Sequence, residues 1–211
     1  MKPNPNYNAF GNCHNNFTIS EKAWIGLSIL FLLDEGVKVG LGKTKFLFWM
    51  IENKGKTPFL APQREFSKIS GFSYVTVFYT VQELMKKGLI KKKPCLKKNN
   101  MGDNDCFFVS LEEVSSLSQK DTKKYVWFFE ALCAVYAHTG SIGSNPQLKF
   151  IEWLYENKNK NELPNSYRGI SEQGGISLAI AHKTIKALEE KGLMKIKELA
   201  LEKFHVIDTV R

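Results

Sequence analysis

The sequence has little of what most catalytic and metal sites need. Its 211 residues include four cysteines and four histidines, and neither set shows the spacing of a zinc site. It has no CxxC pair, no GxSxG or HExxH motif and no phosphate-binding glycine loop. We therefore expect free thiols, no metal, no cofactor and no enzymatic activity. The lack of these motifs does not exclude a tyrosine nucleophile, but the metal-binding histidine pair that would accompany one is absent.

Long apolar runs are also lacking. The longest, residues 24–33, is about half of what a helix needs to cross a bilayer. Residues 1–17 are rich in Asn and Pro and contain no apolar run before a small-residue cleavage site, so we expect a loosely packed arm rather than a signal peptide. The expectation is a cytoplasmic protein without a membrane partner.

Acidic residues are in deficit, because 30 Lys and Arg stand against 21 Asp and Glu, a net charge of +9. Residues 1–116 hold 16 basic and 10 acidic side chains, so +6 of this charge lies in the first half. Such a balance favours a polyanionic partner such as nucleic acid. A solvated lysine-rich surface is the alternative.

One stretch of the sequence occurs twice. "KFLFWMIENK" at 45–54 is similar to "KFIEWLYENK" at 149–158, and the offset of 104 holds without a gap over 49 positions. Of these, 18 are identical, where ordinary amino-acid usage gives about three. Gly36 and Gly140, each at the end of an apolar helical stretch, keep the same offset. The chain is therefore predicted to be an internal duplication.

Each repeat begins with a predicted helix around a tryptophan. Apolar residues at i, i+1, i+3 and i+4 form one stripe, and Trp49 and Trp153 are expected to pack in the core. After a short stretch that suits a strand, a second helix is predicted to begin at Pro62 in the first copy and near Ser166 in the second.

A third helix opens at Ser73 in one copy and at Ser177 in the other. Spacings of i, i+4 and i+7 predict its buried face. The buried residues are expected to be Val77, Val81 and Leu84, and in the second copy Ala181, Ile185 and Leu188. Each third helix stops at a glycine, Gly88 or Gly192, and continues into alternating residues typical of a hairpin.

Short helix, glycine turn, longer helix and hairpin is the order of a helix-turn-helix with a wing. The third helix with "KKGLI" or "EKGLM" resembles the recognition helix and wing entry of MarR-type winged-helix regulators. A MarR-type subunit has one such unit and dimerises through flanking helices, whereas this chain duplicates the unit. In that respect it resembles plasmid and phage replication initiators, which place two winged-helix units in one polypeptide.

If the apolar face of the first copy's third helix is buried, its other residues turn outward. We name Tyr74, Thr76, Phe78, Tyr79 and Gln82 as candidate DNA contacts. Thr76, Tyr79 and Gln82 have polar groups for phosphates or base edges, and Phe78 suits thymine methyl groups. Alternatively, this aromatic face packs against the other repeat, a second subunit or the N-terminal arm.

In the second copy the same projection turns His182, Lys183 and Lys186 outward. The two lysines are the best candidates for base or phosphate contacts. His182 donates to a phosphate when protonated, or is a solvent-exposed bystander. A solvated face is the simpler interpretation of all three.

The first hairpin carries the clearest electrostatic signal, since residues 86–98 contain seven lysines and no acid. Its candidate contacts are Lys91, Lys92, Lys93, Lys97 and Lys98. Strand alternation places Lys91 and Lys93 on one side and Lys92 on the other. A basic wing contacts flanking phosphates or the minor groove, although lysines also protect strand edges from aggregation.

The sequence thus predicts a mainly α protein with small β-hairpins, of the α+β class. Its parts are an arm at 1–17 and two winged-helix domains at 18–115 and 116–211. The expected partner is double-stranded DNA, and the first-choice function is transcriptional regulation. A plasmid or phage replication initiator is the alternative, and a protein-binding winged-helix adaptor of chromosome segregation is the alternative from another class. The DNA site, the effector and the oligomeric state, including a homodimer, are left open.

Overall fold

The computed structural model describes residues 17–54, 59–60, 67, 70–94, 105–142, 144–158, 164, 166–197 and 203–206. The first repeat contains α1 (Ile19–Asp34), α2 (Leu41–Glu52), β1 (Phe59–Leu60), α4 (Tyr74–Lys86), β2 (Ile90–Pro94), β3 (Asp105–Val109) and α5 (Glu112–Ser115). The second contains α6 (Gln119–Thr139), α7 (Asn145–Asn157), α8 (Tyr167–Gln173), α9 (Leu178–Glu190), β4 (Met194–Lys197) and β5 (Lys203–Val206). The predicted class, mainly helical with small antiparallel hairpins, is confirmed.

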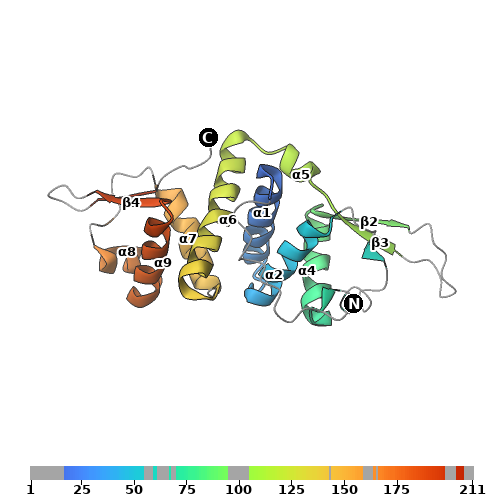
Figure 1. Cartoon of the computed structure of the whole chain (residues 1–211), viewed down its shortest axis with the longest axis horizontal. Helices are drawn as coiled ribbons and strands as arrows, with labels where there is room; N and C mark the ends of the chain where they lie inside the picture. Colours follow the sequence, from blue (N-terminus) through green and yellow to red (C-terminus); the bar gives the residue numbers. More distant parts are fainter. Residues whose placement is uncertain are drawn as a thin grey trace.

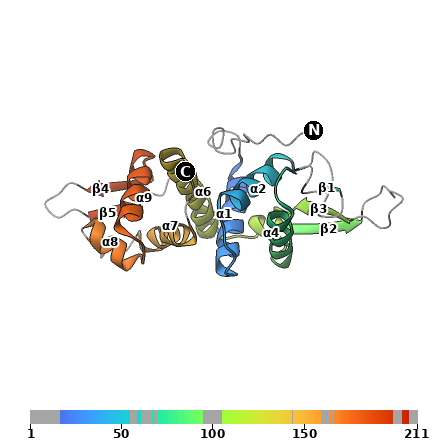
Figure 2. The ribbon, with the colours of Figure 1, turned by 90° about the horizontal axis from the view of Figure 1, so that it is seen from below.

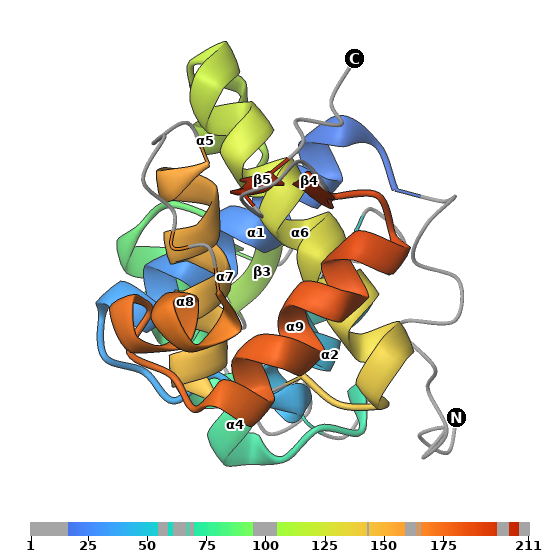
Figure 3. The same cartoon turned by 90° about the vertical axis from the view of Figure 1, so that its left-hand side faces the viewer.

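The molecule is elongated, with α1 and α6 side by side at its centre (Figures 1 and 2). The β2–β3 and β4–β5 hairpins lie at its opposite ends. In the first repeat β1 adds to the hairpin, giving the order β1-β3-β2, while β4 pairs with β5 alone. Figure 3 looks along the long axis, with the second repeat nearest the viewer. The domain boundary predicted at 115/116 falls between α5 and α6 and stays a prediction.

The duplication extends to the backbone and its hydrogen bonds. The six described glycines with positive φ form three pairs at the offset of 104, and these are Gly36 with Gly140, Gly71 with Gly175, and Gly88 with Gly192. Ser67 Oγ donates to the Phe72 carbonyl at 2.6 Å, and Ser171 Oγ donates to the Ile176 carbonyl at the same distance. Because these bonds span the turn between the second and third helices, both repeats hold this turn in the same way.

The tryptophans occupy equivalent places in the two repeats. Trp49 stacks on Phe46 with ring centroids 6.2 Å apart, and Trp153 stacks on Phe150 at 5.9 Å. Both tryptophans are only half-buried at the border of the core, whereas the phenylalanines are fully buried. The expectation that the tryptophans lie in the core is met only in part, since both pack against it as half-buried side chains while the phenylalanines fill its interior.

Helix termini agree with the predicted caps where the structure describes them. Ser73 Oγ accepts from Thr76 N at 3.2 Å, and Ser166 Oγ accepts from Gly169 N at 3.1 Å. Ser177 lies at the N-cap of α9 without a side-chain capping bond. The predicted start at Pro62 lies outside the described residues.

One apolar core continues from the first repeat into the second. Helix α1 is buried nearly all round, as expected of a helix that is apolar on every side. Phe129 of α6 stacks on Phe48 of α2 with centroids 5.4 Å apart. Trp24 Nε1 donates to the Leu89 carbonyl at 3.1 Å and so ties α1 to the start of the hairpin. No helix in the described part of the chain is long and apolar enough to cross a membrane.

Candidate nucleic-acid interface

The third helices, α4 and α9, bury the predicted faces. Val77, Val81 and Leu84 have no exposed surface, and neither do Ala181, Ile185 and Leu188. The opposite faces are therefore available for contacts, and their chemistry differs between the repeats. The structure places α4 and α9 on opposite sides of the central α1 and α6 pair (Figure 1).

The outer face of α4 is aromatic. Tyr74 and Tyr79 are 43% and 55% exposed, and Val75 is 62% exposed. The Phe78 ring lies 5.6 Å from that of Tyr74 and 5.4 Å from that of Tyr79, so the three rings form one cluster. This surface is hydrophobic enough to exclude water from a partner but contains no formal charge.

Two polar candidates on α4 have less freedom than the sequence suggests. Ser73 Oγ donates to Thr76 Oγ1 at 2.9 Å, so the cap orients the Thr76 hydroxyl. Gln82 is half-buried, one turn beyond the aromatic cluster. Each keeps donor or acceptor capacity for a base edge or a phosphate.

The outer face of α9 is basic, and His182, Lys183 and Lys186 are all exposed on it. The His182 ring packs against Tyr167 of α8 with centroids 4.8 Å apart. Tyr167, which is not among the candidate contacts named above, therefore orients His182. Tyr167 and His182 lie 15 residues apart on different helices, so their contact leaves no signal in a single sequence.

The last turn of α9 is acidic and continues the basic face, since Glu190 follows Lys186 by four residues. Burial raises the pKa of Glu189, the charge of His182 offsets part of that rise, and the neighbouring charge of Glu190 raises the pKa further. Glu190 accepts from His138 of α6 at 2.8 Å. The negative charge of α9 is therefore held at its C-terminal end, one turn from Lys186.

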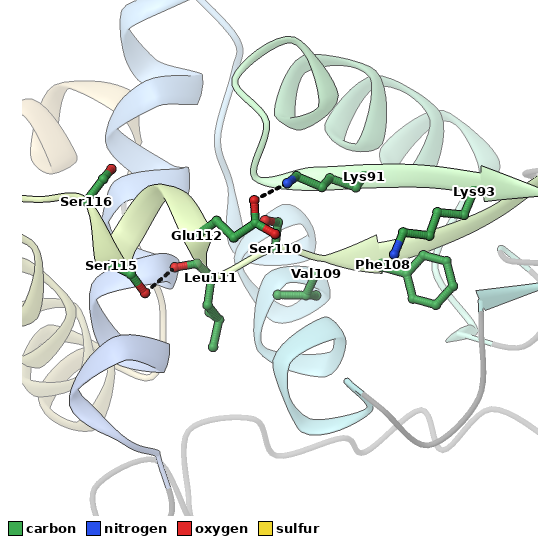
Figure 4. Close-up of a pocket in the computed structure, with 9 residues that line it drawn as sticks. All are labelled: Lys91, Lys93, Phe108, Val109, Ser110, Leu111, Glu112, Ser115 and Ser116. Atoms are coloured by element: carbon green, nitrogen blue, oxygen red, sulfur yellow. Dashed lines mark hydrogen bonds and ion pairs between the residues drawn. The ribbon is translucent and has the colours of Figure 1, made fainter.

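The β2–β3 hairpin has the predicted alternation. Lys91 and Lys93 line one side of an open hollow of about 600 Å³ together with Phe108, Glu112 and Ser115 (Figure 4). The Lys93 ammonium lies 5.7 Å from the Phe108 ring centroid. Lys92 is exposed and pairs in register with Phe107, on the other side of the strand. Lys97 and Lys98 lie outside the described residues.

Lys91 is already paired, although residues 86–98 contain no acidic partner. Its ammonium donates to the Glu112 carboxylate at the start of α5, as Figure 4 shows. The hydrogen bond from Lys91, and then its charge, lower the pKa of Glu112. Glu112 is 21 residues away in the sequence and comes close only because β3 returns the chain along β2. Part of the hairpin's positive charge is therefore neutralised within the protein.

A family model described as "Firmicute plasmid replication protein (RepL)" matches residues 12–101 and, separately, residues 109–201. The two matches coincide with the two repeats. No curated protein matches the chain. The family model favours the replication protein, given above as the alternative, over the transcriptional regulator given first.

Proposed function

Because the chain belongs to the RepL family of Firmicute plasmid replication proteins, we propose that it initiates plasmid replication by binding double-stranded DNA through two winged-helix units. The family match over both repeats carries this proposal. The exposed basic face of α9 and the net charge of +9 support the DNA-binding part. The order α7, α8, α9, β4, β5 supports the winged-helix interpretation.

Each part of a repeat has a separate task in this proposal. Helices α4 and α9 enter the major groove, where Lys183 and Lys186 reach guanine acceptors or phosphates. The wing lysines, Lys92 and Lys93, neutralise phosphates beside the groove and set the register of the protein on the duplex. The chain itself performs no chemistry in this scheme, so a host enzyme or helicase would act on the DNA that it marks.

The number of lysine–phosphate contacts determines how strongly non-specific DNA binding should depend on salt. Each phosphate neutralised by a lysine contributes about 0.9 to the slope of log K against log salt. A protein that uses Lys183, Lys186 and the wing lysines should therefore lose affinity steeply as salt rises. A protein-binding adaptor should show no such dependence on random duplex.

A duplex titration and a plasmid maintenance assay test the proposal together. The plasmid's own origin and a random duplex of equal length are titrated at several salt concentrations with the full chain. We expect preference for the origin, and loss of both binding and plasmid replication when Lys183 and Lys186 are replaced by alanine. The matched control replaces Lys120 and Lys149, two exposed lysines of α6 and α7, and removes the same charge.

Two outcomes would overturn the proposal. Absence of duplex binding at low salt would favour the adaptor. Wild-type plasmid maintenance by the double variant of Lys183 and Lys186, with the control variant equally active, would show that the basic face of α9 has no part in initiation.

A further inference from the structure

The two repeats contact each other through equivalent helices. At the offset of 104, α1 corresponds to the main part of α6, and these two helices pack together in the centre of the molecule (Figures 1 and 2). An interface in which the same surface of two units meets itself is the mark of a two-fold axis. A head-to-tail arrangement would join two different surfaces.

Individual contacts across this interface are reciprocal. Gly26 of α1 lies against the backbone of Tyr125, whose equivalent in the first repeat is position 21. The residue of the second repeat that is equivalent to Gly26 is Glu130, whose carboxylate accepts from Lys22 of α1 at 2.5 Å. Position 26 of each repeat therefore meets position 21 or 22 of the other. Only a two-fold relation exchanges the partners in this way.

Side chains differ at these equivalent positions, but the geometry is kept. Glycine at 26 allows the close approach of the two backbones, because a Cβ atom there would overlap the Tyr125 carbonyl. Glutamate at 130 instead forms an ion pair with Lys22, whose ammonium also lies 5.8 Å from the Phe129 ring centroid. The interface is thus pseudo-symmetric, and one chain holds the arrangement that two subunits form in a symmetric dimer.

The same two-fold axis relates the helices and hairpins that are proposed to contact DNA. Because α1 and α6 are related by a pseudo-two-fold axis, so are α4 and α9, and the two hairpins lie at opposite ends of the molecule (Figure 2). Two helix-turn-helix units related by a two-fold axis read half-sites that are inverted with respect to each other. Units related by translation would read direct repeats.

The two half-sites need not have the same sequence, since equivalent positions of α4 and α9 differ. Phe78, Tyr79 and Gln82 of α4 correspond to His182, Lys183 and Lys186 of α9. Apolar side chains favour contact with thymine methyl groups, and lysine favours the guanine acceptors O6 and N7. The α4 half should therefore be rich in A·T pairs and the α9 half should contain guanine.

We propose that the target of this chain is an imperfect inverted repeat, filled by one chain, with an A·T-rich half read by α4 and a guanine-containing half read by α9. The inference rests on the proposed function, because it specifies the DNA that the same surfaces bind. It adds two properties of the DNA site that duplex binding alone does not imply. The half-sites are inverted with respect to each other, and they differ in sequence.

The test begins with selection of binding sites from a random duplex pool by the full chain. The preferred site is then synthesised in five forms: as selected, with one half reversed to make a direct repeat, with five base pairs inserted at the centre, and as each of the two halves alone. We expect the reversed and inserted forms to bind at least tenfold more weakly, since a five-base-pair insertion turns one half to the opposite face of the helix.

Two substitutions at equivalent positions of α4 and α9 show which half-site each helix reads. Lys183→Ala should weaken binding about tenfold and abolish the preference for guanine in one half only. Tyr79→Ala, at the equivalent position of α4, should relax the preference in the other half only. Each variant is the control of the other, since both side chains are exposed on the outer face of a third helix.

The outcomes separate this inference from the proposed function. Selection of a direct repeat, of a single half-site, or of a site bound by two chains would overturn the inference while leaving duplex binding intact. Equal loss in both halves from either substitution would also overturn it. Failure to bind any duplex would overturn both.

Discussion

Gln147 donates a 2.8 Å hydrogen bond from its Nε2 atom to the buried Oγ1 of Thr184, which joins α7 to α9. In the first repeat Thr80 is equally buried, but its Oγ1 has no hydrogen-bond partner among the described residues. The residue equivalent to Gln147 is Lys43, whose ammonium donates instead to the Lys38 carbonyl at 2.8 Å. The two repeats therefore share a backbone but differ in how a buried hydroxyl is satisfied.

The two threonines should respond oppositely to valine. Thr184→Val leaves the Gln147 amide buried without its acceptor and should lower the free energy of unfolding by about 1–3 kcal/mol. Thr80→Val removes an unsatisfied hydroxyl and should be neutral or stabilising by up to about 1 kcal/mol. Urea unfolding of both variants measures the difference. Equal losses would show that Thr80 has a partner in solution.

Gly26 should tolerate no side chain. Gly26→Ala places a Cβ atom against the Tyr125 carbonyl, forces α1 and α6 apart, and should cost about 1–3 kcal/mol of unfolding free energy. The control is Gly42→Ala in α2, where nothing lies within 4 Å of the added atom. Because alanine favours a helix over glycine, Gly42→Ala should stabilise by up to about 1 kcal/mol. Thermal unfolding of both variants measures these changes. A Gly26→Ala protein as stable as wild type would contradict the close packing of α1 on α6.

Glu21 should make stability depend on acid pH. Burial alone would raise the pKa of this carboxyl, but hydrogen bonds from Lys54 and Thr18 bring it below its ordinary value of 4.5. A group with a lowered folded-state pKa stabilises the fold above its ordinary pKa, and that contribution disappears as the pH falls through the folded value. Glu21→Gln should therefore cost about 1–2 kcal/mol at pH 7.

That cost should shrink as the pH falls below about 4.5, because the wild-type carboxyl becomes protonated and loses its pairing. Urea unfolding at pH 7, 5 and 3.5 follows the difference between variant and wild type. Glu172→Gln, at an exposed carboxylate of α8, is the control and should change little at any pH. A cost for Glu21→Gln that stays constant with pH would rule out the ion pair with Lys54 as its source.

Most of the fold could be predicted because the duplication presents each helix and strand twice, so that the two copies can be compared. The equal spacing of Gly88 and Gly192 located both third helices, and the i, i+4, i+7 pattern placed Val77 and Ala181 inside. The packing of α1 on α6 was not predictable. Helix α1 and residues 125–137 of α6 are apolar on nearly every side, so periodicity does not show which face meets which neighbour.

The candidate site was predicted less completely. Exposure of Lys183 and Lys186 followed from helical geometry alone. The partners of the candidate residues could not be predicted in this way. Glu112 contacts Lys91, and Tyr167 contacts His182, only because the fold brings distant parts of the sequence together. Tertiary contacts of this kind decide which charges are left for a ligand.

The chain should bind DNA without cutting it. We expect no nicked product when supercoiled plasmid carrying the origin is incubated with the protein and Mg²⁺ or Mn²⁺, because the sequence has no histidine pair beside a tyrosine nucleophile. No group of three potential metal ligands occurs in the described part of the chain. Gel analysis of plasmid topology is the measurement. A nicked product with protein attached to one DNA end would contradict the proposal that the chain performs no chemistry.

The wing should bind more tightly when its internal acid is removed. Glu112→Gln leaves the Lys91 ammonium without its carboxylate, so more positive charge faces the duplex. Affinity for random DNA should rise, and the slope of log K against log salt should steepen by up to about one unit if Lys91 then meets a phosphate. Lys93→Ala should have the opposite effect on both quantities for every sequence alike, because a phosphate contact positions the protein and does not read bases.

Asp34→Asn is the matched control for this wing experiment, since it removes an equal charge from an exposed side chain at the end of α1. It should change the salt slope little, because long-range charge is screened within about 10 Å at 0.1 M salt. If Glu112→Gln and Asp34→Asn raise affinity equally, net charge alone explains the effect. If neither Glu112→Gln nor Lys93→Ala alters affinity or slope, the wing does not contact DNA, and its lysines serve to protect the edge of the sheet.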